Sequence, residues 1–244
     1  MDLPVPAKYS LDQILSQLTF ANPPGLPRKI LFWGEGAGGI ASYVAGWLAE
    51  KEIDVIVVDG TNRFDPYTVS SFAKKALVSP EGLLKKIRIA RAFPCYQMAT
   101  LVGERLLHLL GREERSVQPQ KLWVIVLGPI STFLDEDVVE REVRPFFERS
   151  LKKMEEMAMK GIPFLLFQSN LPKSPLRKGG ERVGMSSRRV YLVRSLFQFS
   201  NIVWRIDLED QGPKLILKKG RIEKYPNNKH QIPSTNTQII TNIQ

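Results

Sequence analysis

Short apolar runs alternate with amphipathic stretches along most of this chain. The runs that predict strands are Lys29–Trp33, Ile53–Asp59, Ile87–Ala92, Leu122–Leu127 and Ile162–Gln168. The stretches that predict helices between them are Gly39–Lys51, Tyr67–Leu77, Tyr96–Leu110 and Glu136–Lys160, with Pro145 as a point where the last can break. Strands that alternate with helices specify a mostly parallel sheet covered by helices on both faces, so the predicted class is α/β.

The pattern changes after Gln168. Residues 169–185 are rich in Pro, Gly and basic side chains without an apolar period, which predicts an exposed loop. A short helix or strand is expected at Ser187–Leu196. Asn201–Asp207 and Lys214–Lys219 then form two strands joined by a turn-rich segment, which predicts a C-terminal antiparallel hairpin.

Three segments follow from this organisation. Residues 1–28 hold an amphipathic stretch, Leu11–Phe20, and a Pro-rich joint, so we expect an N-terminal helix and linker. Residues 29–224 form the core domain. Residues 225–244 are rich in Asn, Thr and Gln, and we expect a polar, flexible tail.

Composition excludes some classes of protein but identifies no single function. The chain has 244 residues, of which 43% are hydrophobic, and this excludes a wholly disordered protein. The formal net charge is +10, which suits a polyanionic partner. One cysteine, Cys95, and two distant histidines, His108 and His230, cannot build a disulfide framework or a zinc site, so no metal is expected. No apolar run is long enough for a membrane span, so we expect a cytoplasmic protein without a membrane partner.

A glycine-rich segment directly follows the first predicted core strand. It reads Gly34, Glu35, Gly36, Ala37, Gly38, Gly39, Ile40 and Ala41. As G-x-G-x-x-G, with Asp59 at the end of the next strand, it predicts a dinucleotide or adenosyl-methionine site. As the frame G-x-x-x-x-G-K-[ST], it has Ile40 in place of the lysine and Ala41 in place of the hydroxyl residue. A tight turn that binds no ligand is the third interpretation.

Three further segments resemble one family. Ile87–Met98 contains Ala90-Arg91-Ala92-Phe93 followed by Gln97, and Val57–Pro66 contains Asp59-Gly60-Thr61 before Phe64. Trp123–Ser131 is an apolar strand that ends in Gly-Pro-Ile-Ser. In this order and spacing they resemble archaeal and eukaryotic RecA-like recombinases and their paralogs, within the superfamily that also holds KaiC-like ATPases. The resemblance covers about residues 25–220 and implies a RecA-like, P-loop-type core domain.

The departures from that family concern its ATPase residues. The resemblance puts the phosphate-binding lysine at Ile40, the magnesium-binding hydroxyl at Ala41 and the Walker B aspartate at Leu127. It puts the glutamate that polarises water at Thr61. Both Walker motifs are therefore degenerate, and no group remains to stabilise phosphoryl transfer. We expect no enzymatic activity and no obligatory cofactor, with ATP binding without hydrolysis left open, although Glu35 adds negative charge where a triphosphate would lie.

The second informative segment is a basic loop, residues 170–189. The window from Lys173 to Arg194 holds seven basic residues and one acid, so it supplies +6 of the net +10. The residues expected to contact a phosphate backbone are Lys173, Arg177, Lys178, Arg182, Arg188 and Arg189. Such a loop binds nucleic acid through charge and counterion release. In the family that the chain resembles, the loop at this position is the second DNA-binding loop.

Three functions remain open from the sequence. The first is a non-catalytic RecA-like paralog that binds nucleic acid, in particular single-stranded DNA. It would assist recombination or repair, as a homo-oligomer or together with an active RecA-like relative. The second is a Rossmann-type methyltransferase or NAD-dependent enzyme that uses Gly34, Gly36, Gly39 and Asp59. The third is a scaffold or regulatory module whose basic loop binds an acidic protein.

Overall fold

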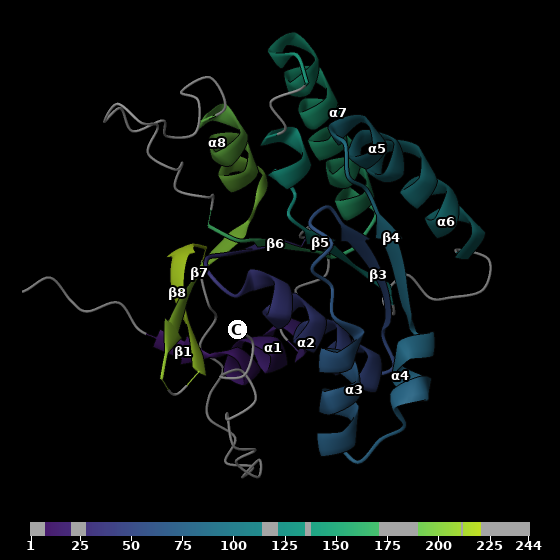
Figure 1. Ribbon diagram of the computed structural model, residues 1–244, viewed down its shortest axis with the longest axis vertical. Coiled ribbons are helices and arrows are strands. Elements are labelled where there is room, and N and C mark those ends of the chain that lie inside the picture. Colours follow the sequence, from purple (N-terminus) through teal and green to yellow (C-terminus); the bar gives the residue numbers. More distant parts are fainter. Residues whose placement is uncertain are drawn as a thin grey trace, which may run out of the picture.

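The computed structural model describes residues 8–20, 28–113, 122–134, 138–170, 190–210 and 212–220. One eight-stranded sheet forms its centre, in the order β1-β8-β7-β2-β6-β5-β3-β4 (Figure 1). The strands are β1 (Lys8–Ser10), β2 (Lys29–Trp33), β3 (Asp54–Asp59), β4 (Ile87–Arg91), β5 (Leu122–Leu127), β6 (Phe164–Gln168), β7 (Ile202–Glu209) and β8 (Gly212–Lys219). Among the described helices, none is both long and apolar enough to cross a membrane.

Pairing in this sheet confirms the predicted class. Strands β4, β3, β5, β6, β2 and β7 are parallel neighbours, whereas β7–β8 and β8–β1 are antiparallel pairs. The fold is therefore α/β with a mostly parallel sheet and a C-terminal antiparallel hairpin. The hairpin is longer than predicted, because its strands continue through Glu209 and begin again at Gly212.

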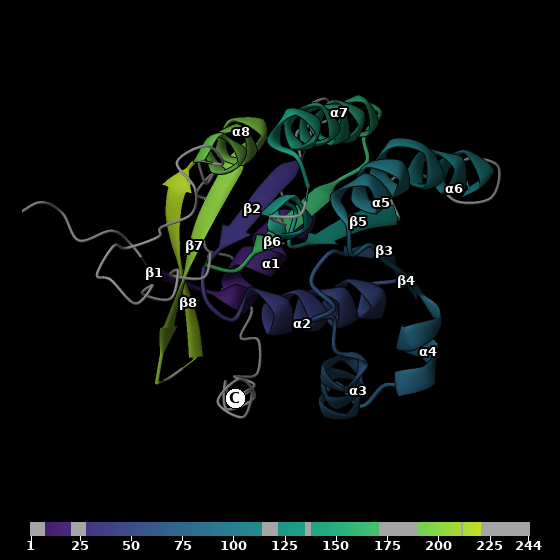
Figure 2. The same ribbon diagram turned by 45° about the horizontal axis from the view of Figure 1, so that its top comes forward.

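Helices cover both faces of the sheet (Figure 2). The first face carries α1 (Leu11–Phe20), α2 (Ala37–Glu50), α3 (Pro66–Lys75) and α4 (Pro80–Lys85). The second face carries α5 (Cys95–Thr100), the π-helical turn Leu101–Arg105, α6 (Leu106–Glu113), α7 (Glu140–Met159) and α8 (Val190–Phe199). Neighbouring strand residues contribute to opposite faces, as Ile30 and Phe32 pack on the first and Leu31 packs on the second. This alternation gives two separate hydrophobic clusters.

Several helices differ from the sequence expectation. Helix α2 begins at Ala37 rather than Gly39, because Gly36 takes a left-handed conformation as the N-cap. Helix α7 continues through Pro145 without a break. The ambiguous segment near residue 190 is a helix, α8, and α4 is an additional short helix that begins at Pro80 with Ser79 as its N-cap.

The described N-terminal residues are part of the same core. The predicted helix over Leu11–Phe20 is confirmed, and its side chains at Leu11, Ile14 and Leu15 are buried on the first face. Strand β1 pairs with β8 through Lys8, Tyr9 and Ser10 and was not predicted. The expected linker and the expected C-terminal tail lie outside the described residues.

Candidate functional site

The glycine segment forms a three-residue turn. Strand β2 ends at Trp33 and α2 begins at Ala37, so only Gly34, Glu35 and Gly36 connect them. Gly34 has φ 145° and Gly36 has φ 77°, both in the region that favours glycine. Gly38 and Gly39 already lie inside the helix. The second half of the G-x-x-x-x-G frame is thus helical rather than an extended loop around an anion.

These glycines permit close packing against β7 and the β3–α3 turn. A Cβ atom on Gly34 would lie 2.6 Å from the Ile206 carbonyl oxygen, and one on Gly36 would lie 3.3 Å from Leu208 Cδ2. A Cβ on Gly38 would lie 3.1 Å from Arg63 Cβ. Each contact is tighter than an ordinary van der Waals distance, so packing alone explains glycine at these positions.

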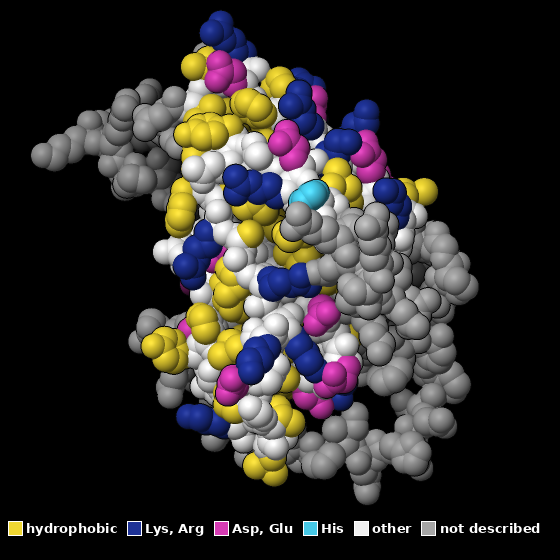
Figure 3. Space-filling model, turned by 90° about the vertical axis from the view of Figure 1, so that its right-hand side faces the viewer, with side chains coloured by type: hydrophobic (Ala, Val, Ile, Leu, Met, Phe, Trp, Pro, Cys, Tyr) yellow, Lys and Arg dark blue, Asp and Glu magenta, His cyan; other side chains and the backbone are white. Residues whose placement is uncertain are grey.

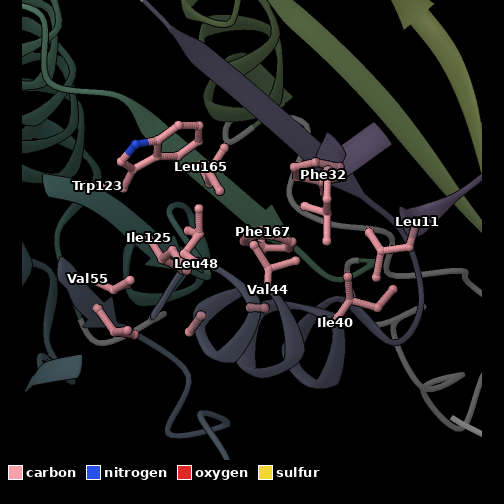
Figure 4. Close-up of a cluster of buried hydrophobic side chains, with 14 of the residues drawn as sticks. Leu11, Phe32, Ile40, Val44, Leu48, Val55, Trp123, Ile125, Leu165 and Phe167 are labelled. Carbon is pink, nitrogen blue, oxygen red and sulfur yellow. The ribbon is translucent and has the colours of Figure 1, made fainter. Parts of the chain in front are cut away.

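Three of the four positions at which polar ATPase residues were expected from the resemblance, Ile40, Ala41 and Leu127, lie in the core, whereas Thr61 is half-buried in the turn after β3. Ile40 and Leu127 are each 1% exposed, and both belong to the hydrophobic cluster of the first face. Figure 4 shows Ile40 on α2 among the apolar side chains of this cluster, which also contains Leu11 from α1. Ala41 is fully buried as well. Glu35, in contrast, is exposed at the turn.

Asp59 holds the turn after β3 together. Its Oδ1 atom accepts hydrogen bonds from the Thr61 amide at 2.9 Å, from Thr61 Oγ1 at 3.0 Å and from the Arg63 amide at 3.4 Å. Its Oδ2 atom accepts from the Phe64 amide at 3.0 Å, and the side chain is fully buried. Both carboxylate oxygens are therefore occupied by the protein's own donors.

Asp59 also lies away from the glycine turn in the sheet. Strands β6 and β5 separate β2, which carries the turn, from β3, which carries Asp59. In a dinucleotide fingerprint the glycine strand neighbours the strand of the ribose-binding acid, in the order 3-2-1-4-5-6. The observed order and the bonding of Asp59 both argue against that interpretation.

The next aspartate caps helix α3, as its position before Pro66 suggests. Asp65 Oδ1 accepts from the Tyr67 amide at 2.9 Å, and Oδ2 accepts from the Thr68 amide at 3.2 Å. The Asp65 amide donates to Ser42 Oγ at 2.9 Å, which ties this cap to α2. The capping interpretation of Asp65 is confirmed.

Gln168, at the end of β6, joins the ends of three strands. Its carbonyl oxygen accepts from the Gly34 amide at 3.0 Å after β2. Its buried side chain accepts from the Ile130 amide at 3.2 Å and donates to Ser131 Oγ at 3.4 Å after β5. The sequence pattern does not predict this role for Gln168. The available signal was a lone amide at the end of the apolar run Phe164–Phe167.

The basic loop starts directly beyond this junction. Its six expected contact residues lie outside the described residues, which stop at Asn170 and resume at Val190. The residues on either side of the loop show where it starts and ends: it follows β6 and precedes α8, which lies on the second face. Strand β2, the neighbour of β6, is followed instead by α2 on the first face. Neighbouring parallel strands whose connections leave to opposite faces form a switch point, where α/β proteins bind ligands.

Comparison with known proteins identifies no family for this chain. No protein-family model matches the chain, and no match was found among curated proteins. Within the described part, no group of three or more His, Cys, Asp or Glu side chains is arranged to hold a metal ion.

Proposed function

We propose that this protein is a non-catalytic RecA-like paralog that binds single-stranded nucleic acid through the basic loop 170–189. The observation that carries the proposal is the origin of this loop at the switch point between β2 and β6, beside the Gly34 turn. A cationic connection at this edge of the sheet lies where a parallel α/β fold receives its ligands. The charge of the segment supplies the attraction to a phosphate backbone.

The proposal excludes ATP hydrolysis as the activity. A phosphate-binding lysine and a metal-binding carboxylate are replaced by Ile40 and Leu127, and both side chains support the core rather than face a ligand. The turn at Gly34 and Gly36 is short and packs closely against β7. This packing supports a protein that binds nucleic acid through the neighbouring loop without binding or hydrolysing a nucleotide at the turn. Assistance to recombination or repair, by self-association or with an active RecA-like relative, belongs to the same proposal.

Fluorescence anisotropy with labelled oligothymidylate over a salt series tests this function. The variant replaces four cations of the loop by alanine: Lys173, Arg177, Lys178 and Arg182. We expect measurable binding at low salt by the unaltered protein. Loss of up to four phosphate contacts would make the slope of log K against log salt shallower by about 3.

A matched control removes the same charge elsewhere. It replaces four exposed lysines of α3, α7 and the end of α7 by alanine: Lys74, Lys75, Lys152 and Lys160. We expect this control to keep most of the affinity and a nearly unchanged slope. No binding by the unaltered protein at low salt, or equal effects of the two quadruple variants, would exclude the basic loop as the site.

A further inference from the structure

The turn that follows α3 has a leucine at a position that favours glycine. The Leu77 amide donates to the Lys74 carbonyl at 3.3 Å, and the Val78 amide donates to the Ala73 carbonyl at 3.0 Å, which is the bonding of a Schellman C-cap. Leu77 has φ 58°, a left-handed conformation that is an outlier for a bulky side chain. Its side chain is 93% exposed, so no burial offsets the cost of this conformation. An exposed apolar side chain held in a strained conformation points to a contact outside the molecule.

The residues next to this leucine add an apolar and a cationic part. Val78 is 38% exposed, and Lys74 and Lys75 are exposed in the last turn of α3. Neither lysine forms an ion pair with another described residue. We call Lys74, Lys75, Leu77 and Val78 the α3 tip.

The charged residues around the α3 tip compensate one another. Lys85 of α4 is paired with Glu81, and Lys86, which follows α4, is paired with Glu52. In Figure 3, hydrophobic side chains lie beside Lys and Arg side chains in the lower part of the view, where α3 and α4 lie. The uncompensated charge at this end of the molecule is therefore that of the α3 tip.

A complementary surface lies at the end of β7. Leu208 is 46% exposed, and its Cδ2 atom would lie 3.3 Å from a Cβ atom on Gly36. Leu208 thus packs against the turn that carries Glu35, which is exposed. Asp210, directly after β7, is exposed too, and neither acid is ion-paired within the described part of the chain. We call Glu35, Leu208 and Asp210 the hairpin cluster.

The α3 tip and the hairpin cluster lie far apart in one molecule. Strand β7 is four strand spacings, or about 19 Å, from β3, which leads to α3. Figures 1 and 2 both show α2 between the hairpin and α3. Helix α2 begins beside Leu208, and α3 packs on its second half at Gly46, where an added Cβ would lie 3.2 Å from Phe72 Cδ1. A contact between the two surfaces therefore joins two copies of the chain.

We infer that the α3 tip of one copy docks on the hairpin cluster of a second copy. Two unpaired lysines meet two unpaired carboxylates in this contact, and the exposed leucines of both surfaces leave water together. A second copy is the favoured partner because the complementary surface is present on the same chain.

Each copy uses two different surfaces in this contact, so the assembly is heterologous and head-to-tail. Both surfaces are small, so association is weak and reversible. The inference names the surfaces for the self-association in the proposed function and rests on that part of it. It does not involve the basic loop.

Sedimentation velocity without nucleic acid, over a concentration series up to the millimolar range, tests the contact. We expect the sedimentation coefficient of the unaltered protein to rise with concentration and to rise less at high salt, because screening weakens the attraction between lysines and carboxylates. A protein that stays monomeric throughout would overturn the inference. Since no nucleic acid is present, that result is distinct from a failure of oligothymidylate binding.

Charge reversal separates this pairing from nonspecific aggregation. The double variant Lys74→Glu/Lys75→Glu has acids on both surfaces, and Glu35→Lys/Asp210→Lys has bases on both, so each alone should associate about tenfold more weakly or less. An equimolar mixture of the two should assemble again, because every α3 tip can then meet a hairpin cluster of opposite charge. If the mixture associates no better than its components, the pairing is wrong.

Leu77→Gly removes the apolar part of the contact without harming the turn. Glycine adopts the left-handed conformation freely, so the fold should keep its stability while association weakens by about tenfold. The controls are Met159→Ala, at a side chain that is 68% exposed, and the charge reversal Lys152→Glu/Lys160→Glu at two exposed lysines. Both controls should leave association unchanged. Full association of Leu77→Gly, or an equal loss in the controls, would contradict the inference.

Discussion

The two ends of the same sheet edge are built in opposite ways. At β2 and β7 the Gly34 turn is closed and leaves no space for a ligand. A Cβ atom added to Gly34 or Gly36 would come too close to Ile206 or Leu208, and the side chain of Ile40 in the following helix is buried. At β3 and β4 the edge is open, and Tyr67 and Phe93 extend into solvent. A glycine-rich turn at a helix start is thus not enough to indicate a ligand site, because glycine serves close packing as well as phosphate binding.

The largest expected effect comes from placing a lysine at the closed end. Ile40→Lys should lower the free energy of unfolding by about 4 kcal/mol or more, because it puts an unpaired charge into an apolar cluster. Urea denaturation measures this, with Ile40→Met as the control of similar volume, for which a loss below about 1.5 kcal/mol is expected. A stable Ile40→Lys protein that gains affinity for ATP would mean that the turn opens toward nucleotide.

Gly34→Ala should be the next most harmful change. The new methyl group would lie 2.6 Å from a backbone carbonyl oxygen of β7 at a φ of 145°, so overpacking and backbone strain add to about 3 kcal/mol. The same denaturation experiment measures the loss. Unchanged stability would show that the turn is loose, and the contrast between the two ends of the edge would disappear.

Gly161→Ala separates strain from crowding. Gly161 lies two residues beyond the last residue of α7, Met159, and has φ 93°, but an added Cβ would have no atom within 4 Å. We expect a loss of about 1 kcal/mol from the backbone conformation alone. If Gly34→Ala costs no more than Gly161→Ala, then close packing against β7 does not decide the glycine at position 34.

The smallest expected effect is at the open end. Tyr67→Ala removes a ring that is 82% exposed, so the free energy of unfolding should change by no more than about 0.5 kcal/mol. Differential scanning calorimetry of this variant measures the change, and circular dichroism checks that α3 remains. A loss above 1.5 kcal/mol, by the usual scale of core truncations, would show that Tyr67 has a structural role.

Most strands and helices of the core could be predicted from the sequence, because apolar periodicity within a short segment is enough to indicate each of them. Lys29–Trp33 and Leu122–Leu127 are the predicted strands residue for residue, since apolar runs of this length are buried on both faces. The sequence predicts that α2 starts at Gly39, two residues too late. The true N-cap, Gly36, has a left-handed backbone and no capping side chain, so it carries no recognisable N-cap signal. Strand β1 has three mainly polar residues and gives no periodic signal.

The site was harder to predict, because it depends on which strands become neighbours. Alternation of strands and helices specifies parallel pairing but leaves strand order open, and the separation of Asp59 from Gly34 follows only from that order. The role of Gln168 likewise needs β2, β5 and β6 side by side. The exposure of the Tyr67 and Phe93 rings could not be predicted from the sequence, because an aromatic residue usually indicates a position in the core.

The strand order also determines when the sheet can assemble during translation. Strand β2 is paired on both sides, by β6 at Phe164–Gln168 and by β7 at Ile202–Arg205, so both of its neighbours are synthesised more than 100 residues later. Its apolar residues Ile30–Phe32 must therefore remain unpaired on the ribosome until most of the chain has emerged. Folding that waits for such distant partners is slow and prone to aggregation, so recovery of this protein in a host cell should depend on chaperones.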